Sequence, residues 1–226
     1  IHGLVRDSEG KKMSKSVGNV IDPIDIIDGI GLDSLTEKRI SNLVQPKLKN
    51  KIIQKTKDEF PDGIQPYGAD ALRFCFCALG STGRDISFDL KRIEGYRNFC
   101  NKLWNASRFV YMTTDDYNYE DKIKFDNLTT YEKFIIIKLD DLVTEYKKHC
   151  TSYRFDLMAN SLYSFIWNEY CDWFVEISKI EIDNGNEYTK NVLIYTLQII
   201  LKLCHPIIPY ITEEIWNEMN SLGYTK

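Results

Sequence analysis

Apolar side chains recur at helical spacing from residue 89 to the end of this 226-residue chain. The spacing is clearest in two stretches, which carry Leu139, Leu142, Val143 and Tyr146 in the first, and Leu162, Phe165, Ile166, Trp173 and Phe174 in the second. The pattern predicts helices over 89–112, 130–150, 155–179, 188–204 and 210–220, with a polar linker at 113–127. Consecutive amphipathic helices of this length, joined by short loops, are typical of an antiparallel helical bundle.

The first 88 residues have a different pattern, in which short apolar stretches alternate with turn residues. Asp22-Pro23 and Pro46 indicate helix starts, because proline fits the first turn of a helix and aspartate caps it. Pro61-Asp62-Gly63 predicts the end of the helix that Pro46 begins. An apolar helix is expected over 70–79.

Between these helices, Ser34 and Glu37 have the spacing of a capping box, which predicts a helix that continues to about Val44. We therefore predict a mainly α fold in two parts. Residues 1–88 form a segment with small α+β elements, and residues 89–226 form the antiparallel helical bundle.

Composition narrows the classes of function. The chain is 43% hydrophobic, enough for a core, and its formal net charge is -4, so no overall positive field attracts nucleic acid and any polyanion site must be a local patch. The apolar run at 134–137 is too short to span a membrane. Six scattered cysteines lack the spacing of a zinc site or a disulfide framework. They predict reduced thiols in a cytoplasmic protein, with no metal bound to this chain and no membrane contact.

One loop near the start of the chain concentrates cations and hydroxyls. Residues 11–19 read KKMSKSVGN and place Lys12, Ser14, Lys15 and Ser16 between two glycines. For an arbitrary basic stretch, a solvated surface turn is the ordinary interpretation. A mobile loop with two ammonium groups, hydroxyls and free amides is also able to fold over a triphosphate and neutralise charge as pyrophosphate leaves.

The letters of this loop and of seven further stretches resemble a known family. Residues 12–16 match the KMSKS signature of the class I aminoacyl-tRNA synthetases letter for letter. The chain resembles the valyl-tRNA synthetases of that class from end to end, through residues 2–7, 18–23, 67–73, 81–86, 94–105, 172–174 and 205–214. GADALR and HPIIPYITEE are shared with isoleucyl and leucyl relatives, whereas TGRDI and EGYRNFCNKLWNA are typical of the valyl family. Val17 departs from the Lys or Leu that relatives often carry.

The resemblance implies part of an enzyme that charges tRNA-Val with valine at the expense of ATP, with Mg²⁺ as the counter-ion of ATP. It implies that Lys12 and Lys15 are catalytic cations that hold the ATP phosphates, Lys15 most directly. Met13, Ser14 and Ser16 would complete the ATP-binding loop. The implied partners are tRNA-Val, and ATP and valine through the catalytic half of the enzyme, and the implied state is a monomer in the cytoplasm.

In that family a Rossmann catalytic domain with the HIGH signature precedes this point, and no His-x-Gly-His motif occurs in the chain. We therefore expect a fragment that runs from the KMSKS loop through the anticodon-binding domain and is inactive alone. A fragment of an isoleucyl-tRNA synthetase is one alternative, because no amino-acid pocket is present to decide. A non-catalytic module of the same fold that binds tRNA or protein is another.

The helix expected over 89–112 has a polar stripe and an apolar side. At about 100° per residue, the stripe contains Lys91, Asn98, Lys102, Asn105 and Phe109, and Asn101 and Arg108 lie on its flank. The opposite side, which predicts the core face, carries Ile93, Tyr96, Phe99, Cys100, Leu103, Ala106 and Val110. The helix has five cationic side chains against two acidic ones.

An unstacked anticodon base binds an aromatic face with amide and cationic groups at its edges. The pattern alone favours a solvated helix face with Phe109 tucked under the linker at 113–127. Together with the family resemblance, it predicts that the seven residues of the stripe and its flank bind tRNA.

Several other residues are expected to be structural. Trp167, Tyr170 and Trp173 are expected in the core of the bundle. His205, beside a proline, is expected to form a hydrogen bond at a helix end, and Arg84-Asp85 is expected to form a local ion pair.

Overall fold

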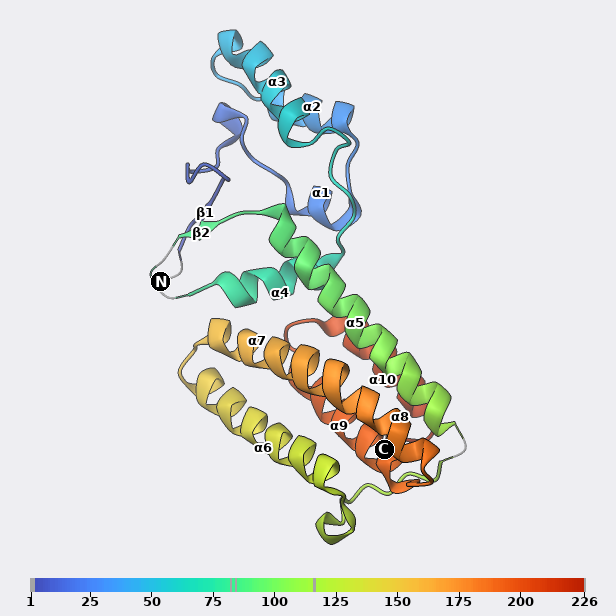
Figure 1. Ribbon diagram of the computed structural model, residues 1–226. Helices are drawn as coiled ribbons and strands as arrows, with labels where there is room; N and C mark the ends of the chain where they lie inside the picture. Colours follow the sequence, from blue (N-terminus) through green and yellow to red (C-terminus); the bar gives the residue numbers. More distant parts are fainter. Residues whose placement is uncertain (1–2, 82, 84, 116, 226) are drawn as a thin grey trace. The chain divides into compact units, whose positions relative to one another are not determined.

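The computed structural model describes residues 3–81, 83, 85–115 and 117–225 (Figure 1). It consists of two compact units, Ile1–Arg97 and Asn98–Lys226, and helix α5 (Leu90–Thr114) runs from the first into the second. The domain boundary predicted between residues 88 and 89 coincides with the beginning of this helix and stays a prediction.

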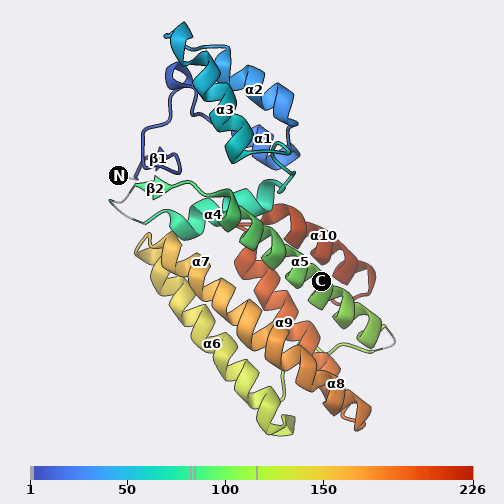
Figure 2. The ribbon, with the colours of Figure 1, turned by 45° about the horizontal axis from the view of Figure 1, so that its top comes forward.

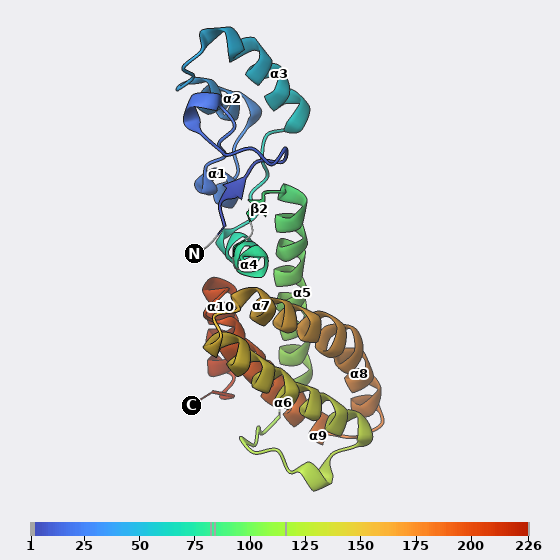
Figure 3. The same ribbon diagram turned by 90° about the vertical axis from the view of Figure 1, so that its left-hand side faces the viewer.

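The first unit combines short helices with a parallel pair of two-residue strands, β1 (Val5–Arg6) and β2 (Ile86–Ser87), in which Val5 lies opposite Ile86. Its helices besides α5 are α1 (Pro23–Asp28), α2 (Leu32–Ile40), α3 (Lys49–Glu59) and α4 (Ala69–Leu79), and α2 packs against α3 (Figure 3). These helices pack around two buried apolar clusters. One contains Ile26, Ala71, Leu72, Cys75, Phe88 and Ile93, and the other contains Leu35, Phe60 and Ile64. Helices this short are marginal in isolation, so this burial stabilises them.

Most helix boundaries in the first unit follow the predicted turn residues. Asp22 caps α1 by accepting a hydrogen bond from the Ile24 amide (3.0 Å), with Pro23 in the first turn. A short 3₁₀ turn that begins at Pro46 leads into α3, which ends two residues before Pro61. These predictions are confirmed, because each signal acts within one turn of the helix that it begins or ends.

The predicted capping box is wrong. Helix α2 begins after Gly31 and ends at Ile40, without a side-chain cap. Leu35, which is 1% exposed, packs into the second buried cluster. Burial of this side chain, and not a cap at Ser34, determines where the helix lies.

The second unit is an antiparallel bundle, as predicted. Besides the C-terminal part of α5 it contains α6 (Thr130–Thr151), α7 (Phe155–Ser164), α8 (Val175–Asp183), α9 (Tyr188–Cys204) and α10 (Pro209–Ser221). Helices α6 and α7 lie side by side and run in opposite directions (Figure 2). Helix α9 buries 11 of its 17 residues and is the central helix of the core. No helix among the described residues combines the length and the apolar character that crossing a membrane requires.

Two helix ends in the bundle are fixed by side chains. Thr129 and Glu132 form a capping box at the start of α6, and the buried Glu132 carboxylate also accepts a hydrogen bond from the Thr189 hydroxyl (2.7 Å). His205 Nδ1 lies 2.9 Å from Thr212 Oγ1, which confirms its predicted role at a helix end.

The helix expected over 155–179 is not regular throughout. Its middle, Phe165–Phe174, is a π-helical segment (η4) that joins α7 to α8. Tyr170 is fully buried, as predicted, but Trp167 and Trp173 are half-buried at the rim and not in the core. The wider turns of a π-helix change which side chains face inward, and apolar spacing does not encode this change.

Candidate functional site

The loop at 11–18 presents its two predicted catalytic cations to solvent. The side chains of Lys12 and Lys15 are exposed and form no ion pair with any described residue. Lys15 begins a short 3₁₀ turn, η1 (Lys15–Val17), and the hydroxyls of Ser14 and Ser16 lie 2.6 Å apart. Two exposed ammonium groups beside two hydroxyls are a donor set suited to phosphate oxygens.

The N-terminal side of the loop is held by two buried polar side chains, Asp7 and Asn19. Asp7 Oδ1 accepts hydrogen bonds from the amides of Lys11 (2.7 Å) and Glu9 (3.1 Å). Asn19 donates to Asp7 Oδ2 (2.9 Å) and to the Lys12 carbonyl (3.2 Å), and it accepts from the Ser14 amide (2.9 Å). The loop therefore has a fixed base beneath its exposed lysines.

Two carboxylates next to the loop have perturbed ionisation. Burial of Asp7 favours its neutral form, but hydrogen bonds from Asn19 and from two backbone amides outweigh this effect and lower the pKa of Asp7. Hydrogen bonds from Lys11 and Lys55 lower the pKa of Glu9 to about 2. Both carboxylates are therefore ionised at neutral pH, and Lys11 and Lys55 are paired.

The C-terminal side of the loop is held by Arg39 of α2. Its buried guanidinium donates from Nε to the Gly18 carbonyl (2.9 Å), pairs with Glu59 (3.2 Å) and lies 5.5 Å from the centre of the Phe60 ring. Gly18 has φ +74°, and a Cβ there would meet the Arg39 carbonyl at 2.8 Å. Glycine is therefore needed at this position both for the turn and for the close approach.

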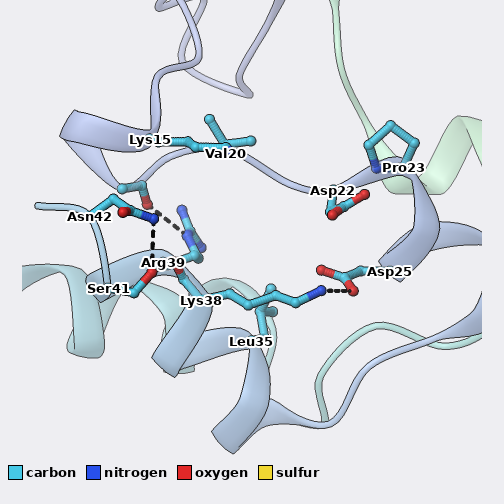
Figure 4. Close-up of a pocket in the computed structure, with 11 residues that line it drawn as sticks. Lys15, Val20, Asp22, Pro23, Asp25, Leu35, Lys38, Arg39, Ser41 and Asn42 are labelled. Atoms are coloured by element: carbon cyan, nitrogen blue, oxygen red, sulfur yellow. Dashed lines mark hydrogen bonds and ion pairs between the residues drawn. The ribbon is translucent and has the colours of Figure 1, made fainter.

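A cavity of about 420 Å³ lies beside the loop, and Lys15 and Arg39 line part of it (Figure 4). Its wall also contains Asp22 and the ion pair between Lys38 and Asp25. Both signs of charge therefore line this space.

The polar stripe of α5 is on the surface, and its opposite side is in the core. Ile93, Phe99, Leu103 and Val110 are fully buried, which confirms the predicted core face. Of the seven predicted tRNA-binding residues, Lys102 and Phe109 are half-buried and the others are exposed, namely Lys91, Asn98, Asn101, Asn105 and Arg108.

The two half-buried residues have partners that sequence reasoning missed. Lys102 forms an ion pair with Asp172 in the π-helical segment, and its ammonium lies 3.8 Å from the centre of the Trp167 ring. The Lys179 ammonium lies 5.4 Å from the centre of the Phe109 ring. These partners are separated from α5 by many residues in the chain, and no spacing signal in one sequence connects them.

The remaining sequence candidates contribute no further site. The described residues contain no group of three or more His, Cys, Asp or Glu side chains that could hold a metal ion. The predicted pair Arg84-Asp85 involves Arg84, which lies outside the described residues. Asp85 pairs with Arg6 and accepts a hydrogen bond from the Leu4 amide (2.9 Å).

Two family models match the chain. The model for class I tRNA synthetases (I, L, M and V) matches residues 1–89, and the model for the anticodon-binding domain of tRNA ligase matches residues 132–225. The first contains the KMSKS loop, and the second contains α6 to α10.

Curated relatives and one solved structure agree with these matches. The chain is 54% identical over 230 residues to the valine--tRNA ligase of Buchnera aphidicola subsp. Schizaphis graminum, covering 100% of this chain and 24% of the relative. It is 53% identical over 227 residues to the valine--tRNA ligase of Francisella tularensis, covering 98% of this chain and 24% of the relative. The chain thus spans about a quarter of the length of these relatives.

The solved structure is the LeuRS-tRNA-LeuAMS ternary complex of Agrobacterium radiobacter K84, with a TM-score of 0.60 and 17% identity, covering 96% of this chain and 22% of that one. At this identity the likeness shows the fold alone. The sequence matches carry the assignment: residues 1–89 belong to the class I tRNA synthetases (I, L, M and V), residues 132–225 to the anticodon-binding domains of tRNA ligases, and along its whole length the chain is similar to the valine--tRNA ligases.

Proposed function

We propose that this chain is part of an enzyme that charges tRNA-Val with valine at the expense of ATP. The observation that carries the proposal is the loop: Lys12 and Lys15 are exposed and unpaired among the described residues, above a base that is fixed on both sides. Identity of 54% to a valine--tRNA ligase along the full chain supports valine over isoleucine as the amino acid.

In the proposed reaction the valine carboxylate attacks the α-phosphate of ATP, which forms valyl-adenylate and releases pyrophosphate. The ammonium groups of Lys12 and Lys15 bind the β- and γ-phosphates and balance the negative charge that builds up on the leaving pyrophosphate. Lys15 does so most directly. Met13, Ser14 and Ser16 shape the loop around the phosphates, and Mg²⁺ accompanies ATP as its counter-ion.

The second part of the proposal is that residues 89–226 bind the anticodon of tRNA-Val. Asn98, Asn101 and Asn105 present amides to base edges, Lys91, Lys102 and Arg108 present cations, and Phe109 presents an aromatic face for stacking. The family match over 132–225 and the tRNA of the structurally similar LeuRS complex support anticodon binding by this part of the chain, and the seven residues are proposed from their exposure and chemistry on α5. We also propose a monomer in the cytoplasm; a reducing compartment fits the six cysteine thiols, four of them buried.

The test of the first part is valine-dependent exchange of pyrophosphate into ATP by the full-length protein that contains this chain. Lys15→Ala should lower the single-turnover rate of valyl-adenylate formation roughly 30- to 1000-fold, the equivalent of about 2 to 4 kcal/mol for one preorganised donor. Valine affinity should change little, because the charge acts as the triphosphate reorganises. Lys47→Ala, at another exposed lysine of the first unit, is the matched control.

The outcomes separate the alternatives. Isoleucine-dependent exchange in place of valine-dependent exchange would assign the chain to an isoleucyl enzyme. No exchange with either amino acid would favour a non-catalytic module. The 226-residue chain alone should show no exchange, because it contains no His-x-Gly-His motif.

A further inference from the structure

Five hydrogen bonds converge on Asp7 and Asn19 below the cationic loop. Asp7 accepts three of them, from the amides of Glu9 and Lys11 and from the side chain of Asn19. Asn19 also donates to the Lys12 carbonyl and accepts from the Ser14 amide. Both side chains are more than nine-tenths buried, at 9% and 7% exposure. Buried polar groups with all of these bonds in place form a rigid unit, because a broken bond leaves a buried group unsatisfied.

The position of these bonds along the chain is specific. One amide side chain fixes the carbonyl of Lys12 and the amide of Ser14, which are the backbone groups on either side of Met13. Fixing both groups sets the direction in which the chain leaves Lys12 and enters Lys15. The side chains of Lys12 and Lys15 are exposed, whereas hydrogen bonds hold the backbone between them.

We propose that Asp7 and Asn19 are positioning residues for ATP, which hold the backbone of residues 12–14 so that Lys12 and Lys15 meet the phosphates in the transition state. This inference rests on the proposed function. Neither residue touches the reacting atoms. Each acts through the loop, and its removal should lower kcat while the affinities for ATP and valine remain.

The variants remove or exchange the hydrogen bonds that Asp7 and Asn19 form. Asn19→Ala removes three bonds, and Asn19→Asp places a second carboxylate against Asp7. The exchanged pair, Asp7→Asn with Asn19→Asp, keeps four of the five bonds. The amide introduced at position 7 accepts from two backbone amides and donates to the carboxylate introduced at position 19, which accepts from the Ser14 amide. Only the bond to the Lys12 carbonyl is lost.

The control for lost stability without a change in the loop is Phe74→Leu, because Phe74 is fully buried in α4 of the first unit. A smaller apolar side chain there leaves a cavity in the core and removes no hydrogen bond from the loop.

The measurement is kcat and KM for valine-dependent exchange in the full-length protein, with the melting temperature of each variant. Asn19→Ala and Asn19→Asp should lower kcat roughly 10- to 100-fold, as expected for a small misplacement of catalytic groups, with both KM values within about twofold. The exchanged pair should recover part of the loss, because the contact between positions 7 and 19 is restored while the Lys12 carbonyl stays without its donor. Phe74→Leu should lower the melting temperature and leave kcat near the wild-type value.

Three results would overturn the proposal. The first is an exchanged pair no faster than Asn19→Asp, and the second is a kcat for Phe74→Leu as low as that for Asn19→Ala. In the third, Asn19→Ala is as active as the wild type while Lys15→Ala is impaired, which removes the positioning role and leaves the proposed function intact. A wild-type protein without any exchange would refute the proposed function and this inference together.

Discussion

Removing either partner of the ion pair between Lys102 and Asp172 should have opposite effects on tRNA affinity but the same effect on stability. If Lys102 binds tRNA, Asp172 competes with the RNA for its ammonium and also repels phosphate. Lys102→Met should therefore weaken tRNA binding, and Asp172→Asn should strengthen it. Both variants remove the same ion pair, so both should destabilise the bundle.

The contacts set the magnitudes. The side chains of Lys102 and Asp172 are 24% and 53% exposed, and a pair this exposed contributes about 0.2 to 1 kcal/mol. The approach of the ammonium to 3.8 Å from the centre of the Trp167 ring adds about 0.5 to 2 kcal/mol. Asp172→Asn loses mainly the first contribution, and Lys102→Met loses both. We expect the free energy of unfolding to fall by less than about 1 kcal/mol for Asp172→Asn and by about 0.7 to 3 kcal/mol for Lys102→Met.

Each variant should change the free energy of tRNA binding by about 0.5 to 1 kcal/mol, the value of one surface charge next to a phosphate, or roughly two- to fivefold in Kd. Titration of the full-length protein with tRNA at several salt concentrations measures this change. If Lys102 contacts a phosphate, Lys102→Met should also reduce the slope of log K against log salt by about 1. A contact to a base edge should leave the slope unchanged and relax the anticodon preference.

Urea unfolding of the 226-residue chain, followed by tryptophan fluorescence, measures stability in the second unit, because all four tryptophans lie after residue 98. The matched controls are Lys190→Met and Glu187→Gln, since this pair has similar exposures of 19% and 62% and neither residue belongs to the predicted tRNA-binding set. Unchanged or weaker tRNA binding by Asp172→Asn, with the expected loss of stability, would show that Lys102 braces the bundle and does not bind RNA.

Three further predictions concern other parts of the molecule. Phe109→Ala should raise KM for tRNA by the equivalent of about 1 to 3 kcal/mol of binding free energy, the value of one base stack, and leave valine activation intact. A lower melting temperature with an unchanged KM would show that Phe109 is structural. Arg39→Leu leaves the Gly18 carbonyl without its charged donor and should destabilise the first unit by about 1.5 to 3 kcal/mol, which circular dichroism should detect while the midpoint of tryptophan fluorescence moves little. The pKa of Asp7 is lowered on folding, so its stabilising contribution is present above the ordinary value of 3.8 and is lost as the pH falls through the lower value in the folded state. The amide resonances of Asn19 should follow this change in a pH titration, and a midpoint above 3.8 would contradict it.

Local signals were enough to predict most of the fold. The start of α1 at Pro23 and the start of α5 after Asp89, whose carboxylate accepts a hydrogen bond from the Lys91 amide (2.9 Å), depend on residues within one turn. The core face of α5 follows from helical spacing in the same way. The capping box at Ser34 failed, because the burial of Leu35 against residues far along the chain outweighed a weak local preference.

The candidate site was predictable only in part. The sequence marks Lys12 and Lys15 through a motif, but it contains no signal that Asp7 and Asn19 meet beneath them, or that Arg39 reaches the Gly18 carbonyl. These contacts depend on how loops and helices pack, as does the pair between Lys102 and Asp172. Residues that act directly on a ligand have recognisable chemistry, whereas the residues that hold them are ordinary polar side chains until the fold brings them together.

The distribution of paired and unpaired lysines supports a phosphate site over a solvated turn. Lys11 and Lys55 both pair with Glu9 at the base of the loop, and among the described residues Lys12 and Lys15 have no ionic partner. The two unpaired ammonium groups carry like charges only three residues apart in the chain, so they repel each other. A polyanion that binds both groups relieves this repulsion and adds attraction. In a chain with a net charge of -4, the two lysines supply the local positive patch that a polyanion needs, on the segment whose backbone Asn19 holds in place.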